Sequence, residues 1–178
     1  HDAVILTSGD KGRNWTRLLY DPERNQAVMD IYFTDEAHGI AVGSYGLYLY
    51  TSDGGETWLD GSVDEDSDYH LNGLVYFGDG KWLIAGEAGT SYRSYDNGET
   101  WEALNLDYQG SMWGGLKTSD GCVLFYGLRG HVLQSCDFGT SWTTITTGSE
   151  SSISGAAEHD GLGLLAANGG IILIRNDS

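Results

Sequence analysis

Short apolar segments separated by turn-forming residues recur along the whole chain. Three that follow one another closely are Asp30–Phe33, Ile40–Gly43 and Leu47–Tyr50, with polar or glycine-containing residues between them. Segments of this length, rich in β-branched and aromatic residues and bounded by Gly or Asp, are typical of β-strands. The 3.6-residue apolar spacing of an amphipathic helix is absent. The pattern therefore predicts an all-β protein whose strands are joined by tight turns.

The same succession of strands is predicted again further along the chain. The strands expected in the next two copies are Leu74–Phe77, Trp82–Gly86, Thr90–Arg93, Gly115–Lys117, Val123–Gly127 and His131–Gln134. One strand, Ala3–Thr7, precedes the first copy, and three more are expected between Ile153 and Asp177. A fourth strand of each copy is expected to begin at a tryptophan, as it does at Trp58.

An eight-residue motif, S/T-x-D-x-G-x-x-W, follows the third strand of each copy. It occurs at Ser8–Trp15, Thr51–Trp58, Ser94–Trp101 and Ser135–Trp142, and its tryptophans are 43, 43 and 41 residues apart. A fifth copy begins at Arg175-Asn176-Asp177-Ser178, with Arg in place of the hydroxyl residue. A repeat of about 43 residues that holds four strands predicts the blade of a β-propeller.

The residue types of this motif indicate a structural role. A short carboxylate can accept hydrogen bonds from N–H groups of its own turn, Gly adopts the left-handed conformation that a turn needs, and Trp is expected to fill the core. The residues to which we assign this role are Asp10, Trp15, Asp53, Trp58, Asp96, Trp101, Asp137 and Trp142.

The predicted strands divide the chain into blades. We interpret residues 1–178 as a single propeller segment with about four blades' worth of four-stranded antiparallel sheets. Its parts are a partial blade at 1–25, blades at 26–68, 69–110 and 111–150, and a partial blade at 151–178. About 17 strands are predicted, one more than four closed blades would use. We therefore expect an arc of a larger ring, cut within a blade at both ends.

The charge of the chain excludes several classes of partner. Nine Lys and Arg residues against 26 Asp and Glu residues give a net charge of −17. Such a field repels phosphate backbones and anionic lipid headgroups, so we expect no nucleic acid partner. No apolar stretch is long enough to span a bilayer, and we expect no direct membrane insertion. The five histidines are scattered and no phosphate-binding or catalytic motif occurs, so neither a cofactor nor a metal is expected.

The repeated motif resembles the Asp box (bacterial neuraminidase repeat) of a propeller superfamily that includes sialidases, xyloglucan-specific glucanases, sortilin-type receptors and non-catalytic assembly factors. The stretches Ala41–Trp58 and Gly127–His131 are most similar to the photosystem II stability/assembly factor family, which has bacterial homologues linked with membrane exporters. The resemblance implies a non-catalytic, extracytoplasmic scaffold, in the periplasm or thylakoid lumen, that binds a protein partner and assists a membrane protein complex or an exporter. The photosynthetic members of the family resemble one another in having a basic, arginine-rich patch for their client. This chain departs from that pattern, because it has only six arginines in all.

A glycoside hydrolase of the xyloglucanase or sialidase type is the alternative. A sialidase needs three arginines that converge on one carboxylate, and the arginines of this chain fall at unrelated positions of the repeat. A glycosidase needs two carboxylates across a cleft, and an acidic propeller offers several. The candidates are Asp21, Glu23, Asp64, Glu65, Asp66, Asp68, Glu87 and Asp107. We interpret the run Asp64–Asp68 as a solvated loop, with a weak cation site as a lesser alternative.

One rim of the propeller is the predicted partner-binding surface. The turns between second and third strands and the connections between blades should share this rim, because successive antiparallel turns alternate between the two ends of a sheet. The turn tips Ser44-Tyr45, Glu87-Ala88, Leu128-Arg129 and Asn168-Gly169, and His1-Asp2 at the same position, vary while their framework repeats. Tyr and Arg are the residue types that anchor protein interfaces. The predicted partner-binding residues are Arg129, Arg24, Tyr45, Glu87, Tyr69 and Tyr108, with Arg129 the strongest candidate.

The two cysteines are not expected to form a disulfide. If Leu128 and Arg129 form a two-residue turn, Cys122 faces Ser135 on the neighbouring strand. Cys136 would then point to the opposite side of the sheet.

Overall fold

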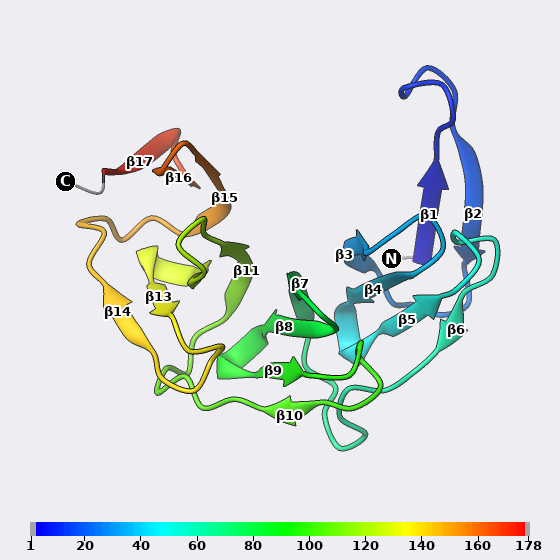
Figure 1. The fold of residues 1–178 in the computed structure, drawn as a ribbon, viewed down its shortest axis with the longest axis horizontal. Coiled ribbons are helices and arrows are strands. Elements are labelled where there is room, and N and C mark those ends of the chain that lie inside the picture. The colour runs from blue at the N-terminus through cyan, green and yellow to red at the C-terminus, as the bar shows by residue number, and fades with distance from the viewer. Residues whose placement is uncertain (1–2, 177–178) are drawn as a thin grey trace. The chain divides into compact units, whose positions relative to one another are not determined.

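The computed structural model describes residues 3–176, which form β-strands connected by turns. The chain divides into two compact units, residues 1–71 and 72–178, and Figure 1 shows the strands of each sheet in chain order. His1, Asp2, Asp177 and Ser178 lie outside the described residues, and with them the His1-Asp2 tip and part of the fifth motif copy. No helix within residues 3–176 has the length and apolar character needed to cross a membrane.

The first unit holds a two-stranded and a four-stranded sheet. Strands β1 (Ala3–Thr7) and β2 (Thr16–Asp21) pair with each other. The second sheet has the order β3-β4-β5-β6, with strands β3 (Val28–Phe33), β4 (Gly39–Gly43), β5 (Tyr48–Thr51) and β6 (Leu59–Asp60). Ile5, Ala41 and Leu49 are buried together, so a small apolar core joins the two sheets.

The second unit holds three further antiparallel sheets. The first has the order β10-β9-β8-β7, with β7 (Leu71–Gly78, whose first residue closes the first unit), β8 (Lys81–Gly86), β9 (Ser91–Ser94) and β10 (Glu102–Ala103). The next comprises β11 (Met112–Lys117), β12 (Val123–Gly127), β13 (Val132–Ser135) and β14 (Thr143–Ile145). The last comprises β15 (Ile153–His159), β16 (Leu162–Ala167) and β17 (Ile171–Asn176). The predicted all-β fold of four-stranded antiparallel sheets is confirmed.

The core of the second unit is centred on Phe125 of β12. Phe125 is completely buried and packs with Leu83, Met112 and other apolar residues of β8, β11 and β13. Trp142, the tryptophan of the fourth motif, stacks on the Phe125 ring with centroids 4.7 Å apart. The motif thus attaches the start of the outer strand to the middle of its own sheet.

The motif tryptophans are less buried than the sequence pattern suggested. Trp58, Trp101 and Trp142 are half-buried, and Trp15 is 61% exposed, so the prediction that Trp15 fills the core is wrong. Trp58 and Trp142 each lie against an aromatic ring of an inner strand, Phe33 and Phe125 respectively. Trp15 belongs to a sheet of two strands within the described residues, and no inner strand of that sheet covers its ring.

The turns between second and third strands contain three residues instead of the predicted two. They are the 3₁₀ turns η1 (Ser44–Gly46), η2 (Glu87–Gly89) and η3 (Leu128–Gly130). The middle residue of each has a left-handed backbone, with φ of 55° at Tyr45, 52° at Ala88 and 55° at Arg129. A glycine with positive φ follows each of them and completes the reversal.

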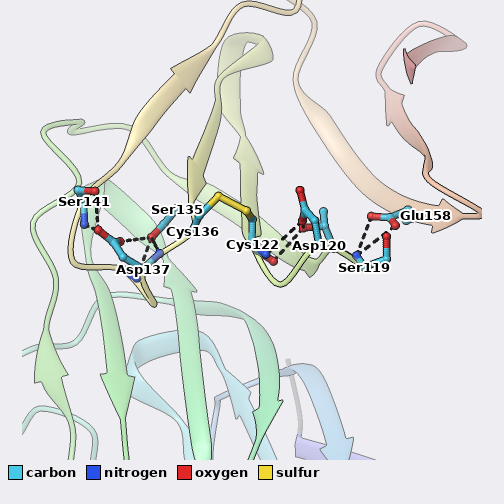
Figure 2. Close-up of a disulfide and its surroundings, with 10 residues drawn as sticks. Ser119, Asp120, Cys122, Ser135, Cys136, Asp137, Ser141 and Glu158 are labelled. Carbon is cyan, nitrogen blue, oxygen red and sulfur yellow. Dashed lines mark hydrogen bonds between the residues drawn. A yellow bond between two sulfur atoms is a disulfide. The ribbon is translucent and has the colours of Figure 1, made fainter. Parts of the chain in front are cut away.

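The additional turn residue overturns the prediction about the cysteines. Val123 pairs with Ser135 across β12 and β13, so the next residues outward, Cys122 and Cys136, face each other. A disulfide joins them, with their Cα atoms 4.1 Å apart (Figure 2). The expected pairing of Cys122 with Ser135 was wrong by one residue, and a one-residue change of register moves a side chain to the other face of a sheet.

Candidate functional site

The 3₁₀ turns are held against the connections between neighbouring sheets. In the first unit the Gly46 N–H donates to the Tyr69 carbonyl at 3.0 Å. In the second unit the Gly89 N–H donates to the Gly110 carbonyl at 3.0 Å, and the Leu128 N–H donates to the Ser111 carbonyl at 3.1 Å. Within each unit, therefore, the turn tips and the connections lie at one common end of the strands, which we call the tip end.

Tyr45 and Tyr69 are neighbours at the tip end of the first unit. Their side chains are 58% and 47% exposed. The Tyr45 ring makes an edge contact with His70, with centroids 4.9 Å apart, and its carbonyl accepts a hydrogen bond from the Gln26 amide at 2.8 Å. These contacts fix the backbone and one side of the ring while leaving aromatic surface available to a partner.

Arg24 lies at the same end but is occupied by two carboxylates of its own unit. Its guanidinium makes a two-bond ion pair with Asp60, one bond being 3.0 Å long, and a third bond to Asp21 at 3.2 Å. The hydrogen bonds between Arg24 and Asp60 are the largest cause of both pKa shifts. They raise the pKa of Arg24 and lower the pKa of Asp60. With a side chain only 19% exposed, Arg24 holds the end of β6 to the β2–β3 connection more than it presents a free charge.

Arg129 is the exposed cation at the tip end of the second unit. It occupies the apex of η3, where its N–H donates to the Ser152 hydroxyl at 3.2 Å. Among residues 3–176 its guanidinium has no ion-pair partner within 4.0 Å, in contrast to that of Arg24. The side chain is thus available for a carboxylate or an aromatic ring of another molecule.

Tyr108 lies beside the Arg129 turn. Its ring stacks on His131 with centroids 4.3 Å apart, and its hydroxyl donates to the Leu128 carbonyl at 3.4 Å. Burial raises the pKa of the Tyr108 phenol, and the positive charge of Arg129 opposes part of that shift. The structure therefore brings Tyr108 and Arg129 together, with His131 completing the cluster.

Glu87 is at the tip end but not at the apex of its turn. Ala88 occupies the apex of η2, and its N–H donates to the Ser111 hydroxyl at 3.2 Å. Glu87 is half-buried at the first position of the turn. The sequence had placed both residues at the tip, and the three-residue turn gives the outermost position to Ala88.

None of the carboxylates proposed for a glycosidase lines the small cavity formed by β11, β12, β15, β16 and the turns next to them. That cavity has a volume of about 20 Å³, and its lining includes Asp120 and Glu158. Such a volume holds about one water molecule and no sugar ring. The Glu158 carboxylate accepts hydrogen bonds from the Ser119 N–H at 3.1 and 3.2 Å. Within the described residues, no three His, Cys, Asp or Glu side chains are placed to hold a metal ion.

The motif aspartates bind the N–H and hydroxyl groups of their own turns. The Asp53 carboxylate accepts hydrogen bonds from the Thr57 N–H at 2.9 Å, the Thr57 hydroxyl at 2.6 Å and the Thr51 hydroxyl at 2.8 Å. The Thr51 hydroxyl in turn accepts a bond from the Gly55 N–H at 2.9 Å. Equivalent bonds to residues two positions before and four positions after the aspartate occur at Asp10, Asp96 and Asp137. This network closes each turn, and structural hydrogen bonds occupy the carboxylate of each motif.

These hydrogen bonds stabilise the ionised carboxylates. The bonds from Thr57 are the main cause that lowers the pKa of Asp53 to about 2. The residue four positions after the aspartate has the same effect on the other three motifs. It lowers the pKa to about 2 at Asp10 and Asp137, and in the same direction at Asp96.

Acid should therefore weaken the fold through the motif aspartates. Because the folded pKa of Asp53 is about 2 and its ordinary value is 3.8, the ionised carboxylate stabilises the protein above about pH 4, and this contribution disappears as the pH falls to about 2. We expect Asp53→Asn to melt at a lower temperature than the parent at pH 6, and the difference to shrink towards pH 2. Thermal melts across this range measure it, with the exposed Glu36→Gln as the matched control. A difference that does not change with pH would contradict this account.

Two histidines contribute to the tip end by ring contacts with predicted partner-binding residues. His70 contacts Tyr45 and His131 stacks on Tyr108, and the supporting role of His131 was not predicted, since the scattered histidines had only argued against a metal site. Their common position near a turn or blade connection was the available signal.

Comparisons with known proteins agree with this architecture. The family model described as "Photosynthesis system II assembly factor YCF48" matches residues 12–162. A curated relative named photosystem II assembly lipoprotein Ycf48, from Synechococcus sp. (strain RCC307), is 50% identical over 40 residues, which are 22% of this chain and 12% of that protein.

Solved structures show the same fold at low sequence identity. The structure titled "YCF48 bound to D1 peptide" has a TM-score of 0.71 at 22% identity and covers 85% of this chain and 50% of its own. A GH74 enzyme of Niastella koreensis has a TM-score of 0.71 at 16% identity and covers 93% of this chain and 30% of its own. This chain thus spans half of the solved YCF48 chain and a smaller part of the curated relative.

Proposed function

Because the chain belongs to the photosynthesis system II assembly factor YCF48 family, we propose that it is a non-catalytic β-propeller scaffold that binds a protein partner during assembly of a membrane protein complex. The match of the family model to residues 12–162 is the observation that carries this proposal. The proposal treats residues 1–178 as one propeller segment with the blade boundaries expected from the sequence.

Support for a protein partner comes from a structural neighbour and from the surface of this chain. The neighbour is titled as YCF48 bound to a D1 peptide, so a peptide of D1 is the first ligand to test here. Exposed Arg and Tyr side chains are the residue types that anchor protein interfaces. Exposed Arg129 beside half-buried Tyr108, and exposed Tyr45 with Tyr69, supply such anchors at the tip ends of the two units.

An extracytoplasmic location, in the periplasm or a thylakoid lumen, is part of the proposal. Disulfides persist in oxidising compartments and are rare in the cytosol, and the Cys122–Cys136 bond supports such a compartment. The name lipoprotein, carried by the curated relative, points the same way. A bacterial exporter would be a partner compatible with the same location.

Charge reversal at Arg129 tests the proposed binding surface. We expect Arg129→Glu to weaken binding of a labelled D1 peptide by at least about tenfold, because the variant loses an attractive charge and adds a repulsive one. Fluorescence anisotropy at low and moderate salt measures the dissociation constant.

Lys81→Glu is the matched control for this experiment. Lys81 is exposed at the start of β8, at the opposite end of the strand from η2, and its reversal changes the net charge by the same amount. Equal weakening by both variants would show a general charge effect and remove Arg129 from the proposed site. If the parent does not bind the D1 peptide at all, D1 is not the partner.

A glycoside hydrolase has weaker support. The likeness to a GH74 enzyme, at 16% identity, extends to the fold alone. The cavity of about 20 Å³ is too small for a sugar, and the glutamate that lines it is bonded to the Ser119 N–H.

A further inference from the structure

The Cys122–Cys136 disulfide joins two sulfur atoms in unequal surroundings. Cys122 is 5% exposed, at the end of the turn that connects β11 and β12. Cys136 is exposed, at the second position of the fourth motif. Making this bond requires removal of two electrons from two thiols, so another molecule must accept them, and an oxidant that is itself a disulfide does so by first exchanging with one of the cysteines.

Several hydrogen bonds hold Cys122 in the interior (Figure 2). Its N–H donates to the Asp120 carboxylate at 3.2 Å, and its carbonyl accepts a bond from the Thr118 hydroxyl at 3.0 Å. The neighbouring Ser119 N–H is bound by the Glu158 carboxylate of β15. Cys122 therefore reaches solvent only if this turn opens.

The position of Cys136 faces solvent in all four complete copies of the motif. The equivalent residues Gly9, Ser52 and Tyr95 are all exposed. The flanking residues Ser135 and Asp137 make the internal bonds of the motif, among them the Ser135 hydroxyl bond to the Asp137 carboxylate at 2.8 Å. A large group attached to Cys136 thus leaves the network of the turn intact, as the tyrosine at Tyr95 does.

We propose that Cys136 is the exchange site for a protein disulfide oxidoreductase and that Cys122 is the resolving cysteine. The Cys136 thiolate attacks one sulfur of the oxidoreductase disulfide, and the other sulfur of that disulfide leaves as a thiolate. The Cys122 thiolate then attacks the Cys136 sulfur, and the oxidoreductase cysteine leaves in its turn. Two electrons pass from the two thiols of this chain to the oxidoreductase, which takes up two protons and ends as a dithiol.

This order of events goes beyond the proposed scaffold function and does not depend on it. The completed bond closes a covalent ring that contains β12, η3 and β13, with Arg129 at its far end. Resolution by a buried cysteine also means that the exchange partner is released only when the β11–β12 turn reaches its native place.

Two single variants test the assignment, with oxidised glutathione as the probe. In folded Cys122→Ser, the remaining Cys136 should form a mixed disulfide at least about tenfold faster than the remaining Cys122 does in folded Cys136→Ser. Mass spectrometry of the two chains measures both rates. In concentrated denaturant the two rates should become equal within about twofold, which assigns the difference to the fold. Equal rates in the folded chains, or a faster Cys136→Ser, would overturn the proposal.

The parent chain gives a second measurement that needs no substitution. Reduced glutathione, followed by an acid quench and alkylation of the chain in denaturant, should place glutathione on Cys136 and the alkyl group on Cys122, as read by peptide mapping. An oxidoreductase that lacks its own resolving cysteine, and whose remaining cysteine carries glutathione as a mixed disulfide, should be captured by the reduced Cys122→Ser chain and not by Cys136→Ser, with glutathione leaving as the thiol. Glutathione found mainly on Cys122 would reverse the assigned roles.

Discussion

Replacing Phe125 by alanine is expected to lower the free energy of unfolding by about 3 to 5 kcal/mol, the range for a large aromatic residue removed from a core. Phe125 is completely buried, and its ring supports the stacked Trp142. The nearby chain cannot fill the space easily, because Gly115 faces the ring and has no side chain to move into it. The loss therefore includes both the buried area and most of the cavity.

Urea unfolding followed by tryptophan fluorescence measures this effect. Phe125→Leu should lose less than half as much, since leucine keeps most of the apolar volume. Leu59→Ala, at a position that is 52% exposed, should change the free energy by less than about 1 kcal/mol. A Phe125→Ala protein as stable as the parent would contradict the placement of this ring at the centre of the second unit.

Removing the disulfide is expected to cost about 3 kcal/mol. The two cysteines are 14 residues apart, and a closed loop of about this length restricts the unfolded chain by an amount of that size. Cys122→Ala with Cys136→Ala should therefore unfold at a lower urea concentration than the parent. The native strands should remain paired, because Val123, Phe125 and Leu133 are buried in a core cluster that contains neither cysteine.

A reducing agent provides the control for this double variant. Dithiothreitol should shift the urea midpoint of the parent towards that of the variant and leave the variant unchanged. If the variant and the oxidised parent unfold at the same urea concentration, the bond does not constrain the unfolded chain as argued.

The order and type of the strands could be predicted because their signals are local. Apolar runs, turn residues and the repeated motif all lie within a few residues of the structure that they specify. The Asp53 turn illustrates this, since its hydroxyl, carboxylate and glycine all act within one eight-residue segment.

The errors arose where one residue changes a register or where distant residues meet. Each tip is a three-residue turn ending in glycine, and the glycines at Gly46, Gly89 and Gly130 were the unused signal for it. The partner of Arg24 is Asp60, 36 positions away, and no local pattern predicts that pair. The exposure of Trp15 likewise depends on which strands lie over it and not on the motif that contains it.

The position of Arg129 within the disulfide ring also affects how the molecule responds to a trypsin-like protease. The Arg129 side chain is exposed at the apex of the turn, but Gly130 is buried and its carbonyl accepts a hydrogen bond from the Thr147 hydroxyl, so cleavage of the Arg129–Gly130 peptide bond requires the turn to loosen first. A cut there would leave two chain ends joined through Cys122 and Cys136, with β12 and β13 still paired in the sheet. The hairpin can therefore be opened at its apex without the fragments separating.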